Sequence, residues 1–237
     1  MSLSRKAGLM ALAFFALTLG GAMTARADVI VMLNTNAGGS PVNLTTTAGA
    51  TTVVGTTAAG NTVNFTGTTA GGGNQLEAES GAAIISAPGN NNGDANITSL
   101  HYELANNQSF TSTQFNVDAT ATGQLQLSIT GVGLNYTDLA NDGVTLVSES
   151  GTLVVLRFDA GSAGSNITNI LAINGQTLTG ITLSSLAGGP EINLIRQIRI
   201  DGDGPTTTNP VPEPVTMLLF GTGLVGVASK VRKRRKA

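Results

Sequence analysis

Short stretches of alternating apolar and polar residues run through the middle of the chain. Residues 100–104 (LHYEL) and 125–130 (LQLSIT) alternate strictly. A period of two predicts strands that bury one face and leave the other in water. Residues 153–158 (LVVLRF) are apolar at every position but one, which predicts a strand that is buried on both faces.

A turn signal lies between two further apolar runs. Residues 170–173 and 177–183 flank Asn174-Gly175, and Asn-Gly supplies the positive φ angles that a type I′ turn needs. The sequence therefore predicts a β-hairpin at this place. A last strand is predicted at residues 192–200, where two arginines interrupt the apolar pattern.

The number of short strands predicts an all-β protein. At least eight of them fall in roughly 175 residues, and no stretch between residues 28 and 204 keeps a helical period. We expect an antiparallel, jelly-roll-like β-sandwich over residues 74–204. Residues 28–73 are rich in Thr, Gly and Ala. They predict either a meander of weak strands or a flexible arm with too few apolar groups to order it.

The first residues have the three parts of a secretory signal. A basic pair (RK) precedes an apolar run over residues 7–19, and Ala25 and Ala27 form a small-x-small cleavage site. The run is too short to span a bilayer and directly follows the basic pair. Residues 1–27 are therefore expected to be removed by signal peptidase, so that the mature chain begins at Asp28.

The other end of the chain predicts a spacer, a membrane segment and a basic tail. Four prolines within residues 205–214 (PTTTNPVPEP) predict an extended spacer. Residues 215–229 carry no charge and predict a short transmembrane helix of about 22 Å, against a hydrocarbon core of about 30 Å. The tail, residues 230–237, should stay on the cytoplasmic side. Its basic cluster consists of Lys230, Arg232, Lys233, Arg234, Arg235 and Lys236.

The order of these C-terminal elements resembles the PEP-CTERM sorting signal. Pro212, Glu213 and Pro214 match its Pro-Glu-Pro motif residue for residue. Val215 and Thr216 stand where the family commonly has a Ser-Thr pair. The resemblance implies that exosortase, a membrane protein, recognises the motif and removes the tail. The helix would hold the chain in the inner membrane until the protein is released to the cell surface or to exopolysaccharide.

Residues 110–202 also resemble, more loosely, the sandwich domain of small PEP-CTERM proteins. The likeness lies in three strands, at residues 123–130 (GQLQLSIT), 167–175 (ITNILAING) and 195–202 (IRQIRIDG). This resemblance implies a β-sandwich and implies no activity.

Composition narrows the range of functions. The chain has no cysteine and one histidine, which excludes a disulfide framework, a thiolate nucleophile and a Cys/His zinc site. Between residues 28 and 210, three arginines stand against 13 of the 14 acidic residues, a net charge of −10. Such a surface repels phosphate backbones, so nucleic acid is excluded as a partner.

Two features offer groups for acid–base chemistry. His101 is the sole candidate general base, but it lies on the polar face of its strand and no G-x-S-x-G elbow accompanies it. Glu77 and Glu79 point to one side of a strand, about 7 Å apart, as glycosidase carboxylates can. Glycine-rich neighbours place them on an open edge. We therefore expect no enzymatic activity, and a secreted hydrolase is the least favoured function.

One loop offers ligands for a cation. Asp201 and Asp203 lie in an Asp-Gly-Asp-Gly stretch, and calcium prefers such oxygen ligands, although the register of an EF-hand is missing. A structural calcium ion is the only cofactor that the sequence suggests.

These observations favour an exported, non-enzymatic protein of the cell surface or of an exopolysaccharide (biofilm) matrix, with a structural or adhesive role. The alternative is a carbohydrate-binding jelly roll for exopolysaccharide, which would use polar loops such as residues 141–143 and 201–204 in place of aromatic platforms.

Overall fold

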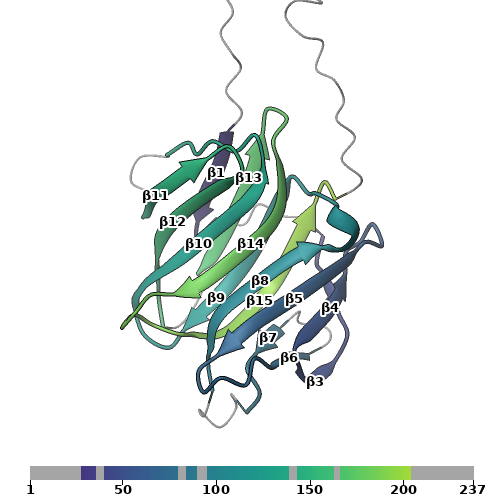
Figure 1. The fold of residues 1–237 in the computed structure, drawn as a ribbon, viewed down its shortest axis with the longest axis vertical. Coiled ribbons are helices and arrows are strands. Elements are labelled where there is room, and N and C mark those ends of the chain that lie inside the picture. The colour runs from purple at the N-terminus through teal and green to yellow at the C-terminus, as the bar shows by residue number, and fades with distance from the viewer. Residues whose placement is uncertain are drawn as a thin grey trace, which may run out of the picture. The chain divides into compact units, whose positions relative to one another are not determined.

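The computed structural model describes residues 28–35, 40–79, 84–89, 95–138, 143–162 and 166–203. These residues form fifteen strands in two layers (Figure 1). The front sheet consists, in spatial order, of β4 (Thr52–Thr56), β5 (Thr62–Thr69), β8 (Ile97–Leu104), β14 (Thr177–Ser185), β10 (Gly123–Val132), β12 (Leu153–Ala160) and β11 (Val144–Ser150). The back sheet consists of β1 (Asp28–Leu33), β13 (Ile167–Ile173), β9 (Ser112–Ala119), β15 (Ile192–Asp201), β7 (Ile84–Ser86), β6 (Leu76–Glu79) and β3 (Thr47–Ala50).

Two short elements complete the architecture. Strand β2 (Asn43–Leu44) pairs with β4, and the 3₁₀ helix η2 (Ala105–Asn107) follows β8. Pairing of Ile97 with Ile192 connects β8 to β15 and so joins the two sheets. The paired strands are antiparallel. The predicted fold class, an all-β antiparallel sandwich, is confirmed, whereas the predicted helix at residues 215–229 lies outside the described residues.

Rows of apolar side chains that cross the front sheet build the core. Phe65, Tyr102, Ile181, Ile129 and Val154 are register partners on five successive strands, and each is fully buried. The alternating pattern of the sequence is the cause, because every second residue of a strand faces the same side. The predicted strands at residues 100–104 and 125–130 therefore occupy the centre of the front sheet.

Residues 28–73 do not form a separate arm, and their described part is largely in paired strands. Strand β1 pairs with β13 of the back sheet, and β5 pairs with β8 of the front sheet. Val53, Val63 and Phe65 are fully buried, and the ring of Phe65 lies 5.6 Å from that of Tyr102, centroid to centroid. A few large apolar groups are thus enough to attach this stretch to the rest of the sandwich.

Two expectations for single strands were wrong. Strand β12 is buried on one face only: Leu153 is 37% exposed and Val155 is half-buried, because they lie on the outer face of the front sheet. Strands β13 and β14 do not form a hairpin. Both Asn174 and Gly175 have positive φ, as predicted, but β13 pairs with β1 and β9, whereas β14 pairs with β8 and β10. The turn therefore leads the chain from one sheet to the other.

A β-bulge in β15 decides which side chains of that strand face outward. Asn116 and Gln114, two residues apart on β9, pair with Arg196 and Arg199, three residues apart on β15. The extra residue is taken up where Gln197 has a φ of 55°. Ile195 and Ile198 are consequently both buried in the core. The two arginines share the outward face of the back sheet, because register partners point to the same side.

A hydrogen-bonded pair inside the core links the two sheets. The hydroxyl of Tyr102 on β8 lies 2.8 Å from Oγ1 of Thr113 on β9, and Thr113 donates to the carbonyl of Arg199 on β15. Because the proton of Thr113 is used in this way, Tyr102 is the donor in the first bond. Complete burial raises the pKa of Tyr102 above its usual value.

The positive φ of Gln197 predicts a stabilising substitution. An L-residue in this conformation costs about 1–2 kcal/mol, whereas glycine adopts it freely. Gln197→Gly should raise the free energy of unfolding by about 0.5–1 kcal/mol in a denaturant titration. The matched control is Gln124→Gly in β10, where φ is not positive; it should lower stability by about 0.5–1 kcal/mol. A loss of stability in both variants would contradict the strained bulge.

The buried tyrosine predicts an alkaline loss of stability. Above about pH 10 the unfolded chain ionises this tyrosine while the folded protein keeps its proton. The free energy of unfolding should then fall by up to about 1.4 kcal/mol per pH unit. Tyr102→Phe should lower stability near pH 7 by about 1–2 kcal/mol, because Thr113 loses a donor, and should flatten the alkaline slope. Urea titrations from pH 7 to 11.5 measure both effects; equal alkaline slopes in the two proteins would refute the assignment.

Candidate functional site

A pocket of about 180 Å³ opens on the outward face of the back sheet. One row of its lining, Met32, Asn169, Gln114 and Arg199, crosses β1, β13, β9 and β15 in register. A second row, Leu171, Ser112 and Asp201, runs beside it on β13, β9 and β15. Regular pairing on β13 and β9, with the bulge on β15, brings these side chains to one place.

The segment that follows β1 is fixed to the same face. Asn169 donates from Nδ2 to the carbonyl oxygen of Thr35 and, at 3.2 Å, to its hydroxyl. The backbone N–H of Ser40 donates to Oδ1 of Asp201 at 3.1 Å. Further backbone bonds run from Ile200 to Ser40 and from Val42 to Ile198. The described ends of this segment, residues 34–35 and 40–42, are thereby tied to β13 and β15.

Polar side chains on this face are buried, which is unusual for the outer side of a sheet. Gln114, Asn116 and Asn169 are 3%, 4% and 2% exposed. The Oδ1 atoms of Asn116 and Asn169 accept no hydrogen bond within the described structure. Buried acceptors are normally satisfied by protein, water or ligand. Both oxygens are also shielded from solvent, so they lie beneath the accessible surface of this face.

Each arginine on this face has a carboxylate near it. Arg196 lies 3.0 Å from Oδ2 of Asp118, with both side chains partly shielded from solvent. Arg199 and Asp201, two positions apart on β15, both line the pocket. Arg196 and Arg199 are two of the three arginines between residues 28 and 210. The part of the face around β9 and β15 therefore holds two of the three cations of a region whose net charge is −10.

The predicted calcium residues have separate protein partners. Asp201 accepts from Ser40 as described above. Asp203 accepts on Oδ2 from the hydroxyl of Thr57 and, at 2.7 Å, from Nδ2 of Asn61, which ties the end of β15 to the β4–β5 turn. Within the described ranges no group of three or more His, Asp or Glu side chains is placed to hold a metal ion.

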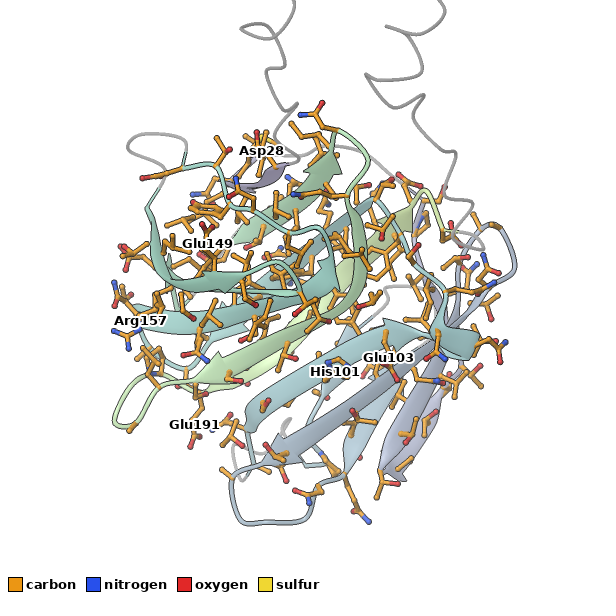
Figure 2. All side chains as sticks on the ribbon, turned by 45° about the horizontal axis from the view of Figure 1, so that its top comes forward. Asp28, His101, Glu103, Glu149, Arg157 and Glu191 are labelled. Carbon is orange, nitrogen blue, oxygen red and sulfur yellow. The ribbon has the colours of Figure 1, made fainter. Side chains whose placement is uncertain are left out.

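His101 projects from β8 on the outer face of the front sheet, next to Glu103 (Figure 2). Its Nδ1 lies 2.9 Å from the hydroxyl of Thr182, and its Nε2 lies 3.5 Å from a carboxylate oxygen of Glu103. The side chains of His101 and Glu103 are 35% and 53% exposed. The order hydroxyl, imidazole, carboxylate is that of a nucleophile and its base, but stabilising a developing charge requires a water-excluded site.

Glu77 and Glu79 lie at alternate positions of β6, with Leu76 and Ala78 buried on the other side of the strand. Glu77 is half-buried and Glu79 is exposed. Neither lines the pocket. Their common face agrees with the alternation of the sequence, and it brings them to no other candidate residue.

Several predicted site residues lie outside the described residues: Ala25, Ala27, Pro212, Glu213, Pro214, the basic cluster from Lys230 to Lys236, and the first two residues of the 141–143 loop. Asp28 is described and begins β1, where its Oδ1 accepts from Nδ2 of Asn135 at 2.9 Å. No helix in the described part of the chain is long and apolar enough to cross a membrane.

The sequence interpretation missed most of the pocket. It selected Asp201 but not Ser112, Gln114, Asn169 or Arg199. A usable signal exists in residues 112–119 (STQFNVDA), where Gln114, Asn116 and Asp118 alternate with residues that the structure buries in the core. Most strands carry polar residues on their outward face, however, so this alternation of amides does not by itself indicate a site.

Comparison with known proteins yields one match. A family profile described as the PEP-CTERM protein-sorting motif matches residues 210–235, which include Pro212, Glu213 and Pro214. Neither the curated proteins nor the solved structures contain a significant match. The chain therefore carries a PEP-CTERM protein-sorting motif at residues 210–235, the signal of an exported protein that exosortase sorts.

Proposed function

We propose that the protein is a non-enzymatic component of the cell surface or of the extracellular matrix, in which the β-sandwich has a structural or adhesive role. The sorting motif carries this proposal, because it directs the chain out of the cell. The net charge of −10 between residues 28 and 210 supports it further. Such a charge keeps an exported domain soluble and disfavours binding to anionic polymers.

The distribution of reactive groups supports a binding role over a catalytic one. His101 is open to solvent on the front sheet, whereas the pocket lies on the back sheet and contains no histidine. The carboxylate of Asp201 in the pocket already accepts a backbone hydrogen bond. A general base needs to reach a bound substrate, and the candidate base and the pocket lie on opposite faces.

A carbohydrate-binding module is the second candidate function. The observation that favours it is the pocket itself, which combines amides, an arginine, a carboxylate and a hydroxyl with apolar side chains. Small-molecule sites typically have such a mixture of apolar walls and a few convergent polar groups.

The sorting proposal is tested by the intact mass of the protein from membrane and medium fractions of its native host. We expect a species in the medium that begins at Asp28 and has lost the basic tail. Glu213→Ala should leave the tail attached and the protein in the membrane fraction. Pro205→Ala, in the same spacer but outside the Pro-Glu-Pro triplet, is the matched control and should be processed normally.

Two results would contradict the proposal. Wild-type protein that keeps residues 232–237 and stays with membranes would show that the C-terminal segment is a permanent anchor. Normal release of Glu213→Ala would show that removal of the tail does not depend on the motif.

A further inference from the structure

We propose that the free edge of strand β11 is a self-association surface, through which two copies of this chain pair edge to edge and antiparallel. This inference rests on the structural or adhesive role proposed above and names the partner in that role, a second copy of the same sandwich. The residues that carry it are Leu146 and Val147, with Thr145 and Ser148 on either side of them.

Strand β11 forms one end of the front sheet and pairs on one side only (Figure 1). Its neighbour is β12, and among the described residues no further backbone hydrogen bond reaches residues 145–150 of this strand. In an antiparallel sheet, part of the N–H and C=O groups of such a strand point away from its one neighbour. These groups form a row that another extended strand can satisfy in series.

The other edges of the sandwich are bonded or short. On β1, Val29 donates to Asn135 and accepts from Thr137. On β4, the pairing with β2 and the hydrogen bond from Thr45 to Val54 occupy the outer side. Strand β3 has four residues, and its pairing with β6 shifts register. Of the described strands, β11 therefore has the longest open edge.

Exposed apolar side chains gather at the same end of the front sheet. Among the described residues, four of the five exposed large apolar side chains lie on β10, β11 and β12: Val132, Leu146, Val147 and Leu153. Leu146 and Val147 are 42% and 47% exposed. A β-bulge between Leu146 and Ser148 leaves Val147 without a register partner on β12. Removing these side chains from water is favourable, so their burial would add to the backbone pairing.

The edge is also a place where two acidic copies can meet without opposing charges. The net charge of −10 between residues 28 and 210 makes two copies repel each other in general. Residues 143–148 (GVTLVS) carry no charge, and they lack the lysine or proline that often protects a natural edge. Glu149 accepts from the backbone N–H of Tyr136 at 3.0 Å, which ties this carboxylate to its own domain. Two identical edges are complementary to each other about a two-fold axis.

Complete overlap of the two strands fixes the register. Strand β11 spans Val144–Ser150, so its midpoint is Val147, and the two-fold axis passes beside this residue. Val147 then faces its own symmetry mate, and the interruption that the bulge causes falls at the axis in both copies. The strand has seven residues, against about 20–30 a side in a standard interface. We therefore expect weak association, with a dissociation constant on the order of 0.1 mM.

Disulfide trapping in the full chain in detergent tests this register, because the chain has no cysteine of its own. Val147→Cys should give a disulfide-linked dimer with copper phenanthroline, since directly opposed residues lie about 4.5–5.5 Å apart, within reach of a disulfide. Thr145→Cys is the matched control on the same edge. It should give at least tenfold less dimer, because four residues along the strand separate it from its symmetry mate by about 14 Å. Val54→Cys, a comparably exposed valine on β4, measures chance collision.

Sedimentation velocity measures the association without a cross-link. Wild-type protein should dimerise between about 0.02 and 1 mM, a range that brackets the expected dissociation constant. Val147→Lys should weaken dimerisation at least tenfold, because like charges would then oppose each other at the axis. Val54→Lys makes the same change of net charge away from this edge and should leave the affinity within twofold. Thermal unfolding of each variant checks that it folds.

Three outcomes would overturn the inference. The first is wild-type protein that stays monomeric at about 1 mM, roughly tenfold above the expected dissociation constant. The second is trapping of Thr145→Cys or Val54→Cys as efficient as that of Val147→Cys. The third is dimerisation that Val147→Lys leaves unchanged, since the contact would then lie elsewhere. The preparation keeps the C-terminal tail, so these results do not depend on sorting, and failure of either proposal can be recognised separately.

Discussion

The bulge at Gln197 is the constraint on which both faces of the back sheet depend. In a regular strand, residues three apart point to opposite sides. Only one of Ile195 and Ile198 would then face the core, and one of Arg196 and Arg199 would be forced into it. The extra residue in β15 brings both isoleucines inward and both arginines outward. Burying an arginine without a partner would cost far more than the strain of one residue at positive φ.

The two outer faces of the sandwich differ in a way that follows from what lies over them. On the front sheet, the side chains of polar residues such as His101 and Glu103 are partly exposed to solvent. On the back sheet, Gln114, Asn116 and Asn169 are buried, and the segment after β1 is bonded to β13 and β15 beside them. The hydrogen bonds of Thr35 and Ser40 attach the described ends of that segment to two residues of the pocket, Asn169 and Asp201. The same pattern of alternating amides and hydroxyls therefore gives plain surface on one sheet and a candidate site on the other.

The sequence predicted local structure well and long-range structure poorly, for physical reasons. Alternation at residues 100–104 and 125–130 identified strands and their buried faces, because the period of two is a property of the strand itself. Asn174-Gly175 identified a tight turn, but the turn does not determine which strands pair on either side of it. Strand pairing depends on the sheet from which each strand buries its apolar residues. Here Ile170 enters the core from the back sheet and Ile181 from the front sheet. Asp201 was selected as a calcium ligand from its loop composition. Its actual neighbours, Ser40 and the residues of β9 and β13, are distant in sequence.

The sandwich also constrains what chemistry the protein can perform. Catalysis by acid and base requires the reactive groups to converge on one substrate. Here the lone imidazole lies on the outer face of the front sheet, and the arginine, carboxylate and amides of the pocket lie on the outer face of the back sheet. Facing sheets pack about 10 Å apart, so a core of apolar side chains separates the two sets. Among the described residues, the pocket lining combines these polar groups with the apolar side chains of Met32, Ile170 and Leu171. Whatever this domain does, the sorting motif at the end of the chain marks it for export.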